Sequence, residues 1–158
     1  MSDNNLFAQT YPKLNHVGIV VRDIDQASRD NSNRFGLNAV FRRITLHIEN
    51  ALYQGKTVTF SAEFGFIELG NTMLELIQPL GNDPTPYLDA LQERGENTHH
   101  LAYVVPSIDE HLKMARKSNA PLSVILDAKL PGGMGRYVYV DGLLHGVLTE
   151  LIELAQQI

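Results

Sequence analysis

The sequence contains no cysteine and no tryptophan. The lack of cysteine excludes disulfide bonds, thiolate metal sites and a cysteine nucleophile, so any metal ion would be held by histidine, aspartate or glutamate. No apolar run approaches the roughly 20 residues that a membrane helix requires, and the start of the chain lacks the charged-then-apolar order of a signal peptide. We therefore expect a cytoplasmic protein that has no membrane partner.

Positive charge is also scarce. There are 13 lysines and arginines against 18 aspartates and glutamates, which gives a formal net charge of -5. Binding to nucleic acid depends on clustered basic residues that neutralise phosphates, so we do not expect a nucleic-acid partner. Hydrophobic residues make up 44% of the 158 residues, which is ordinary for a soluble globular protein. The expected partner is a small molecule.

The chain contains an internal repeat. The stretch NHVGIVVRDID (15–25) matches HHLAYVVPSID (99–109) at a constant offset of 84 residues, which pairs His16 with His100. Further on, MLELIQ (73–78) matches LTELIE (148–153), which pairs Glu75 with Glu150. We interpret the chain as two copies of one unit, and each copy runs from a histidine strand to a glutamate strand.

Each unit has the pattern strand, helix, then two or three strands, which predicts an α+β fold of two tandem βαβββ units. Helices are expected over 23–35 and 107–119, with Asp23 and Ser107 as N-caps. The first copy is longer, and we place the insertion in HIENALYQGK (47–56). The predicted organisation is an N-terminal tail (1–13), a first unit (14–80), a connector (81–97) and a second unit (98–158).

Alternation along the two histidine strands predicts which side chains face a cavity. His16 shares a face with Gly18, and His100 shares one with Ala102, whereas the bulky apolar neighbours lie on the other face and should pack on a helix. The small residues leave room beside both imidazoles. His99 should then point the other way and support the fold by hydrogen bonding.

The two glutamates need a partner. Glu75 and Glu150 lie in apolar strands, where an unpaired carboxylate is costly to bury or is forced to protonate, so each requires a compensating cation. A single strand histidine is more often a hydrogen-bonded structural residue than a ligand. Two histidines and two glutamates at repeat-related positions favour a shared site instead.

The remaining polar residues give weaker signals. Three histidines are expected to have structural or surface roles, namely His47, His111 and His145. Three arginines are interpreted as surface charges and only as weak candidates for gripping a substrate carboxylate or phosphate, namely Arg42, Arg43 and Arg136. Because Tyr137 and Tyr139 alternate with two valines, one pair should pack and the other should face the cavity or a partner chain.

The paired units resemble the vicinal oxygen chelate superfamily, which includes glyoxalases, bleomycin resistance proteins, extradiol dioxygenases and methylmalonyl-CoA epimerases. The stretches LNHVGIVVRDID, LGNTMLELIQPLG, THHLAYVV and GVLTELIEL are most similar to the epimerase branch. The resemblance implies a curved open barrel around a central cavity, and a homodimer. It places the metal positions on His16, Glu75, His100 and Glu150.

Two imidazoles and two carboxylates suit a divalent Zn, Ni, Co, Mn or Fe ion. The resemblance implies a metal-dependent lyase or isomerase of the glyoxalase or methylmalonyl-CoA epimerase type, which stabilises the enolate of a small acyl thioester or hydroxy-keto substrate. Tyr53 stands where the epimerases carry a catalytic glutamate, so we expect Glu49 or a metal-bound carboxylate such as Glu150 to act as the base. The alternatives are a metal-free small-molecule binding protein of the bleomycin-resistance type and an extradiol-type dioxygenase. Residues that bind the substrate are not assigned.

Overall fold

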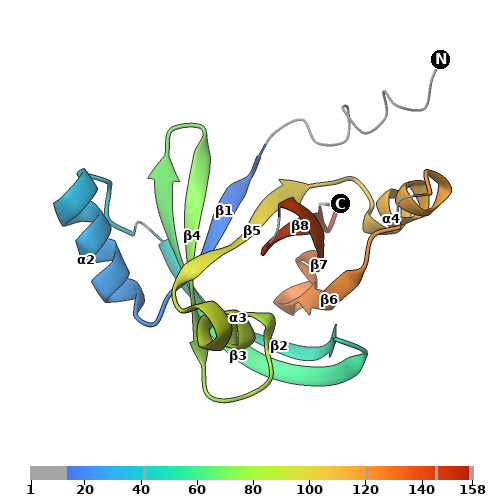
Figure 1. Ribbon diagram of the computed structural model, residues 1–158, viewed down its shortest axis with the longest axis horizontal. Helices are drawn as coiled ribbons and strands as arrows, with labels where there is room; N and C mark the ends of the chain where they lie inside the picture. Colours follow the sequence, from blue (N-terminus) through green and yellow to red (C-terminus); the bar gives the residue numbers. More distant parts are fainter. Residues whose placement is uncertain (1–13, 41, 120, 145, 157–158) are drawn as a thin grey trace.

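The computed structural model describes residues 14–40, 42–119, 121–144 and 146–156, so the predicted tail 1–13 and His145 lie outside the described residues. These residues form eight strands and three α-helices (Figure 1). The strands are β1 (His16–Val20), β2 (Arg42–Tyr53), β3 (Lys56–Leu69), β4 (Thr72–Leu80), β5 (Asn97–Val104), β6 (Val124–Leu130), β7 (Gly135–Leu144) and β8 (Val147–Leu154). The helices are α2 (Ile24–Phe35), α3 (Pro86–Arg94) and α4 (Ile108–Lys117), and a short 3₁₀ turn, η1, covers Pro131–Gly133.

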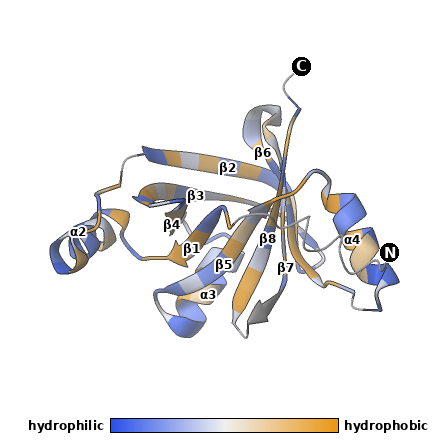
Figure 2. Ribbon diagram, turned by 90° about the horizontal axis from the view of Figure 1, so that it is seen from above, coloured by the Kyte–Doolittle hydropathy of each residue, from blue (hydrophilic) through white to orange (hydrophobic). Residues whose placement is uncertain are grey.

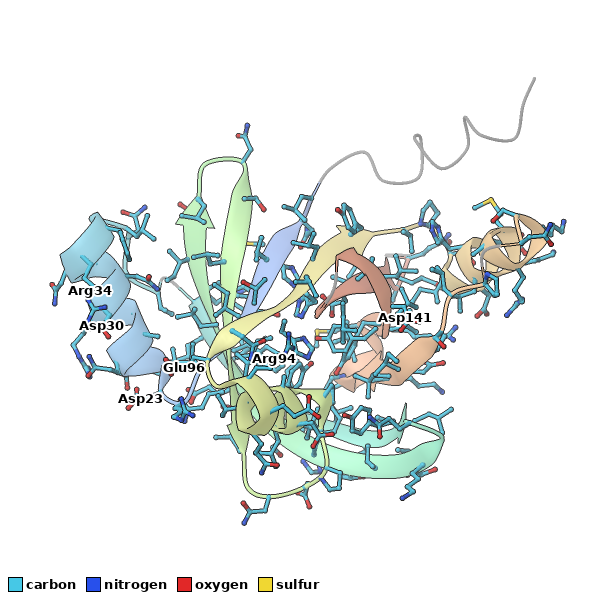
Figure 3. All side chains as sticks on the ribbon, viewed as in Figure 1. Asp23, Asp30, Arg34, Arg94, Glu96 and Asp141 are labelled. Atoms are coloured by element: carbon cyan, nitrogen blue, oxygen red, sulfur yellow. The ribbon has the colours of Figure 1, made fainter. Side chains whose placement is uncertain are left out.

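Both long helices begin where the sequence predicts. The Asp23 carboxylate accepts a hydrogen bond from the Gln26 amide at 2.9 Å, and the Ser107 hydroxyl accepts one from the Glu110 amide at 3.3 Å, so both predicted N-caps are confirmed. Figure 3 shows Asp23 and Arg34 at opposite ends of α2, which places each charge where the helix dipole favours it. Within the described residues, no helix has the length and apolar character needed to cross a membrane.

The strands form one closed barrel in the order β1-β4-β3-β2-β6-β7-β8-β5. Each unit contributes four neighbouring strands, and the two units meet at two seams. One seam is the antiparallel pair β1 and β5, which cross the centre of the molecule side by side in Figure 1. The other is a short contact between β2 and β6. The predicted α+β fold of two βαβββ units around a central cavity is confirmed. The barrel is closed, because strand pairing continues around all eight strands.

The apolar residues fall into an inner core and two outer clusters. The inner core is rich in aromatic side chains, including Phe60, Phe64 and Tyr87, the last of which enters from α3. One outer cluster packs beneath α2 and includes Val21 and Ile24. The other packs beneath α4. Figure 2 shows the apolar and polar bands that alternate along strands such as β2 and β5, and Figure 1 shows α2 and α4 on opposite sides of the barrel. The faces predicted to pack on helices do so.

The segment HIENALYQGK forms a hairpin that lengthens β2 and β3. Gln54 and Gly55 join the two strands and both have positive φ, as a type I′ turn requires. The strand register shifts between Ile48 and Ala51, which leaves Glu49 outside the regular ladder. The predicted insertion therefore extends the sheet.

Candidate metal centre

The seam between β1 and β5 brings the two repeat-related histidines together. In this antiparallel pair His16 lies opposite Ala102, and His100 lies opposite Gly18. Residues paired in this way point to the same face of the sheet, so each imidazole enters the barrel beside a small residue of the other unit. The two Nε2 atoms are 3.0 Å apart. The predicted faces of His16 and His100 are correct.

The two glutamates lie on the strands on either side of this seam, β4 and β8. In the parallel pairs β1–β4 and β5–β8, Glu75 lies beside Gly18 and Glu150 lies beside Ala102. The small residues therefore leave space for the glutamates as well as for the histidines. All four side chains are buried, because none of the four residues is more than 7% exposed.

Each carboxylate lies close to both imidazoles. Glu75 Oε2 lies 3.3 Å from His16 Nε2 and 3.4 Å from His100 Nε2. Glu150 Oε2 lies 3.1 Å and 3.2 Å from the same two nitrogen atoms. The structure thus brings together all four residues that the sequence reasoning selected as metal ligands.

The distances between the two imidazoles, and from each imidazole to the carboxylates, lie in the range found in the shell of a divalent cation. With ligand distances of about 2.1 Å, neighbouring ligand atoms lie about 3.0 Å apart in an octahedral shell and about 3.4 Å apart in a tetrahedral one. Glu150 Oε2 is buried yet accepts no hydrogen bond of good geometry from the described residues, as expected of an oxygen that faces a shared cation. His16, Glu75 and His100 offer ligand atoms that all lie within 4.8 Å of one another. This group could hold a divalent metal ion, and Glu150 is the candidate for a fourth ligand.

The four groups also shift one another's protonation. Burial lowers the pKa of His16, but the carboxylates of Glu75 and Glu150 outweigh burial and raise this pKa to about 10. The same balance raises the pKa of His100. Burial raises the pKa of both glutamates, but the two imidazoles outweigh it and lower these pKa values. Without a metal ion the site therefore holds protons on its histidines, and a cation that binds must displace them.

His99 does not point away from the site as the alternation predicts. A register shift in the β1–β5 pair, next to Gly18, inserts one extra residue into β5 and turns the His99 side chain toward its neighbour. His99 Nδ1 lies 2.9 Å from His100 Nδ1, and the ring packs against Tyr87 and Tyr139. The prediction of its face was wrong because of this β-bulge, whereas the predicted hydrogen-bonding role agrees with the structure. Burial and the nearby charge of His100 lower the pKa of His99 to about 3, so its ring stays neutral.

A cavity of about 210 Å³ opens beside the four groups. Most of its wall is apolar and includes Phe64, Phe66, Ile152, Met73 and Leu46. Tyr137 also lines this cavity, and its hydroxyl is buried without a hydrogen-bond partner among the described residues. The nearby Tyr87 hydroxyl is instead paired with that of Tyr139, at 2.8 Å.

Tyr137 is a functional candidate that the sequence reasoning reached only in part. The alternation allowed either the tyrosines or the valines of β7 to face the cavity. The tyrosines face inward, and Val138 and Val140 pack in the cluster beneath α4. Burial raises the pKa of Tyr137, so this hydroxyl keeps its proton and can donate a hydrogen bond into the cavity.

The structure does not bring Glu49 to the site. Its side chain is 71% exposed, and its carboxylate lies 3.7 Å from His47 Nε2 on the outside of the barrel. Tyr53 is buried, but its hydroxyl donates a hydrogen bond to Asp89 at 2.5 Å. Neither residue is among those that line the cavity beside the metal-ligand candidates.

The arginines separate into two groups. Arg43 and Arg136 form ion pairs on the surface of the barrel, the first with Asp25 and Glu63 and the second with Asp109 and Asp127. Arg42 is exposed but lines the cavity, and its guanidinium carbon lies 4.6 Å from the centre of the Phe66 ring. Of the three, Arg42 is therefore the one placed to meet a ligand.

The other two described histidines lie outside the site. His47 Nδ1 is 2.9 Å from the Ser61 hydroxyl on the neighbouring strand. His111 is buried on α4, and burial lowers its pKa. Both positions agree with the structural or surface roles expected from the sequence.

Comparison with known proteins identifies the family. Residues 15–139 match the Glyoxalase/Bleomycin resistance protein/Dioxygenase superfamily, so the chain belongs to this superfamily. Human mitochondrial methylmalonyl-CoA epimerase is 32% identical over 145 residues, which cover 88% of this chain and 72% of that protein. The uncharacterized protein YqjC of Bacillus subtilis is 28% identical over 141 residues, which cover 89% of this chain and 91% of that protein.

A solved structure supports the fold. The crystal structure of methylmalonyl-CoA epimerase from Mycobacterium tuberculosis superposes with a TM-score of 0.65 at 20% identity, over 93% of this chain and 91% of that one. Together with the human relative, this similarity confirms the resemblance to the epimerase-like branch that the sequence indicated.

Proposed function

We propose that this protein is a metal-dependent isomerase of the epimerase or glyoxalase kind, which moves the proton next to the carbonyl of a small acyl thioester or hydroxy-keto compound. The observation that carries this proposal is the convergence of two imidazoles and two carboxylates beside a largely apolar cavity, in which the imidazole nitrogens lie 3.0 Å from each other and 3.1 to 3.4 Å from the carboxylate oxygens. Its relatives support an isomerase-type function.

His16, Glu75, His100 and Glu150 would hold the ion. Their mixed nitrogen and oxygen donors suit Zn, Ni, Co, Mn or Fe. A divalent ion bound there acts as a Lewis acid toward a substrate oxygen and lowers the barrier to loss of the adjacent proton.

The proton itself must move to a group of the protein. A base has to lie within about 3 Å of that proton, directly or through one water. Among the described residues that line the cavity, the carboxylates are those of Glu75 and Glu150, and Glu49 is absent from its wall. We assign the base to Glu150, because it lines the cavity but is not among the three residues whose ligand atoms all lie within 4.8 Å of one another. The Tyr137 hydroxyl donates a hydrogen bond to a substrate oxygen in the same cavity.

The size and charge of the cavity restrict the substrate. A cavity of about 150 Å³ holds a molecule as large as benzene, so the 210 Å³ here suits a small acyl or hydroxy-keto group. A larger carrier would remain outside, where Arg42 offers a positive charge to an anionic part of it. Acyl thioesters are the first class to test, because the human relative is named for methylmalonyl-CoA. The homodimer and the cytoplasmic location remain predictions from the sequence.

Solvent exchange tests the proposed reaction. Protein loaded with each candidate metal is incubated with a panel of acyl thioesters and hydroxy-keto compounds in deuterated water, and loss of the proton next to the carbonyl is followed by NMR. We expect exchange that stops when a chelator removes the ion and that falls about 100-fold or more in Glu150→Gln. Glu49→Gln is the matched control and should exchange at the wild-type rate.

Two results would count against this assignment. Metal binding without exchange across the whole panel would favour a dioxygenase or a binding protein. Exchange that survives in Glu150→Gln but disappears in Glu49→Gln would move the base to the β2–β3 hairpin.

A further inference from the structure

Each candidate metal-binding histidine has a hydrogen-bonding neighbour at the preceding position in the chain. His16 Nδ1 lies 2.8 Å from Asn15 Oδ1, and His100 Nδ1 lies 2.9 Å from His99 Nδ1. Asn15 and His99 are themselves 84 residues apart, so they occupy the same position in the two copies of the repeat. Both contacts are made by the ring nitrogen that faces away from the metal centre.

The tautomer of each imidazole decides whether it can bind a metal ion. A neutral imidazole carries one hydrogen, on either Nδ1 or Nε2, and only the nitrogen without hydrogen has a lone pair for a cation. In both His16 and His100 it is Nε2 that faces the other ligand candidates. The hydrogen must therefore be on Nδ1, and the group next to Nδ1 must be an acceptor.

Asn15 meets this requirement directly. Its Oδ1 is an amide oxygen, which accepts and cannot donate, so the contact at 2.8 Å fixes the hydrogen on His16 Nδ1. Asn15 immediately precedes β1, and its backbone amide donates to the Ala102 carbonyl at 2.8 Å. This backbone bond anchors the residue beside the ring it orients.

His99 meets the same requirement through its contact with His100. The two Nδ1 atoms lie 2.9 Å apart, so one of them donates a hydrogen bond to the other. His100 Nε2 faces Glu75 and Glu150 and must be free of hydrogen to bind an ion, so the hydrogen of His100 is on Nδ1 and His99 Nδ1 is the acceptor.

We propose that Asn15 and His99 are positioning residues that hold His16 and His100 in the tautomer with hydrogen on Nδ1, so that both Nε2 atoms face the metal ion. This inference rests on the proposed metal site and adds an acceptor to each half of it. In the second unit the β-bulge is the feature that turns His99 toward His100, and so the bulge has a function at the site. Removing a hydrogen-bond acceptor of a metal-binding histidine typically lowers metal affinity by about 10- to 100-fold.

Cobalt affinity of the whole chain tests the proposal. Apparent affinity for Co²⁺ is measured by competition with a chromophoric chelator for the wild type and for two variants that lack the acceptor, Asn15→Ala and His99→Phe. We expect each substitution to weaken binding by about 10- to 100-fold. In His99→Asn and Asn15→Asp an oxygen takes the acceptor position, so binding should stay within about threefold of the wild type or tighten. His111→Phe controls for replacing a buried histidine away from the site.

A spectroscopic measurement separates this role from general loss of structure. In the cobalt-loaded wild type, the two Nδ1 hydrogens should give two hyperfine-shifted proton signals that disappear in deuterated water. Asn15→Ala should alter the signal of His16 alone, and His99→Phe that of His100 alone. If His99→Phe fails to fold by circular dichroism, Asn15→Ala and the retained affinity of His99→Asn decide the question.

The outcomes distinguish this inference from the proposed function. If the wild type binds no divalent ion, both are overturned. If the wild type binds cobalt and both acceptor-free variants keep its affinity and both signals, the metal site stands and the positioning role is overturned.

Discussion

The imidazole of His100 occupies the space that a side chain at Gly18 would fill. A Cβ atom at residue 18 would lie 2.1 Å from His100 Cε1, a separation that real Cβ atoms essentially never show. Gly18 also lies opposite His100 in the β1–β5 pair and beside Glu75 in the β1–β4 pair. Because Gly18 has no side chain, the imidazole of His100 and the carboxylate of Glu75 can both lie next to this position of β1.

The first prediction is that Gly18→Ala displaces the His100 ring and removes one ligand from the proposed site. We expect the affinity for Zn²⁺ or Co²⁺ to fall at least about 100-fold, because the remaining ligands cannot close the shell. Metal content after dialysis and competition with a chelator measure this loss.

Gly65→Ala provides a matched control on β3. A Cβ atom there would lie 2.9 Å from Ile24 Cγ2, in the cluster beneath α2, so this variant strains packing away from the metal centre. It should lower the melting temperature but keep the metal affinity. Equal metal loss in both glycine variants would show that crowding anywhere in the first unit disturbs the site.

The repeat and the alternation were enough to predict the four converging residues. The constant offset of 84 paired His16 with His100, and the small residues beside them marked the face with space for a ligand. What alternation could not reveal is the bulge at His99, because a register shift depends on how β5 pairs with β1, a strand from the other unit. The alignment of the two repeat copies did carry a signal for these positioning residues. It pairs Asn15 with His99, and each of them immediately precedes a ligand candidate.

The predicted role of Glu49 depended on how the longer first copy was explained. We placed the extra length in an insertion and expected Glu49 within it to act as the base. The inward alternation of Ile44, Leu46 and Ile48 continues into this segment and favours a longer strand. The hairpin turn at Gln54 and Gly55 then follows from two adjacent positive φ values. Local alternation was the better guide than the comparison of lengths.

The second prediction is that metal binding releases protons. The carboxylates raise the pKa of His16 to about 10 against the cost of burial and also raise that of His100, so the metal-free site is protonated at neutral pH. We expect the release of one proton or more per ion at pH 7.5, whereas an imidazole with an ordinary pKa near 6.5 would release only about 0.1. Calorimetric titration in buffers of different ionisation enthalpy gives this number. Release near zero would mean that the histidines are neutral before the ion arrives.

The third prediction concerns Tyr137, whose buried hydroxyl faces the cavity without a partner. Tyr137→Phe should slow solvent exchange of a substrate by about 100-fold, the usual effect of removing one hydrogen-bond donor to a developing negative charge. Metal affinity should not change, because Tyr137 is not among the proposed ligands. Tyr53→Phe is the control, since the Tyr53 hydroxyl is committed to Asp89. A Tyr137→Phe protein that exchanges at the wild-type rate would remove this residue from the proposed reaction.

The fourth prediction is that His16 makes the free energy of unfolding depend on pH. A group whose pKa is raised in the folded state stabilises the protein fully below its unfolded pKa, and this stabilisation is lost as the pH rises toward the folded value. For His16 the window runs from 6.5 to about 10. Within it the free energy of unfolding of chelator-treated protein should fall by up to about 1.4 kcal/mol per pH unit for one such group.

Metal-loaded protein should show no such fall from His16, because its imidazole is already deprotonated when it holds the ion. Urea unfolding at several pH values between 6.5 and 10 measures both slopes. His16→Gln supplies the control, since it removes one titrating ring and should reduce the slope of the metal-free protein. Parallel slopes for the metal-free and metal-loaded wild type would show that His16 does not exchange its proton for the ion.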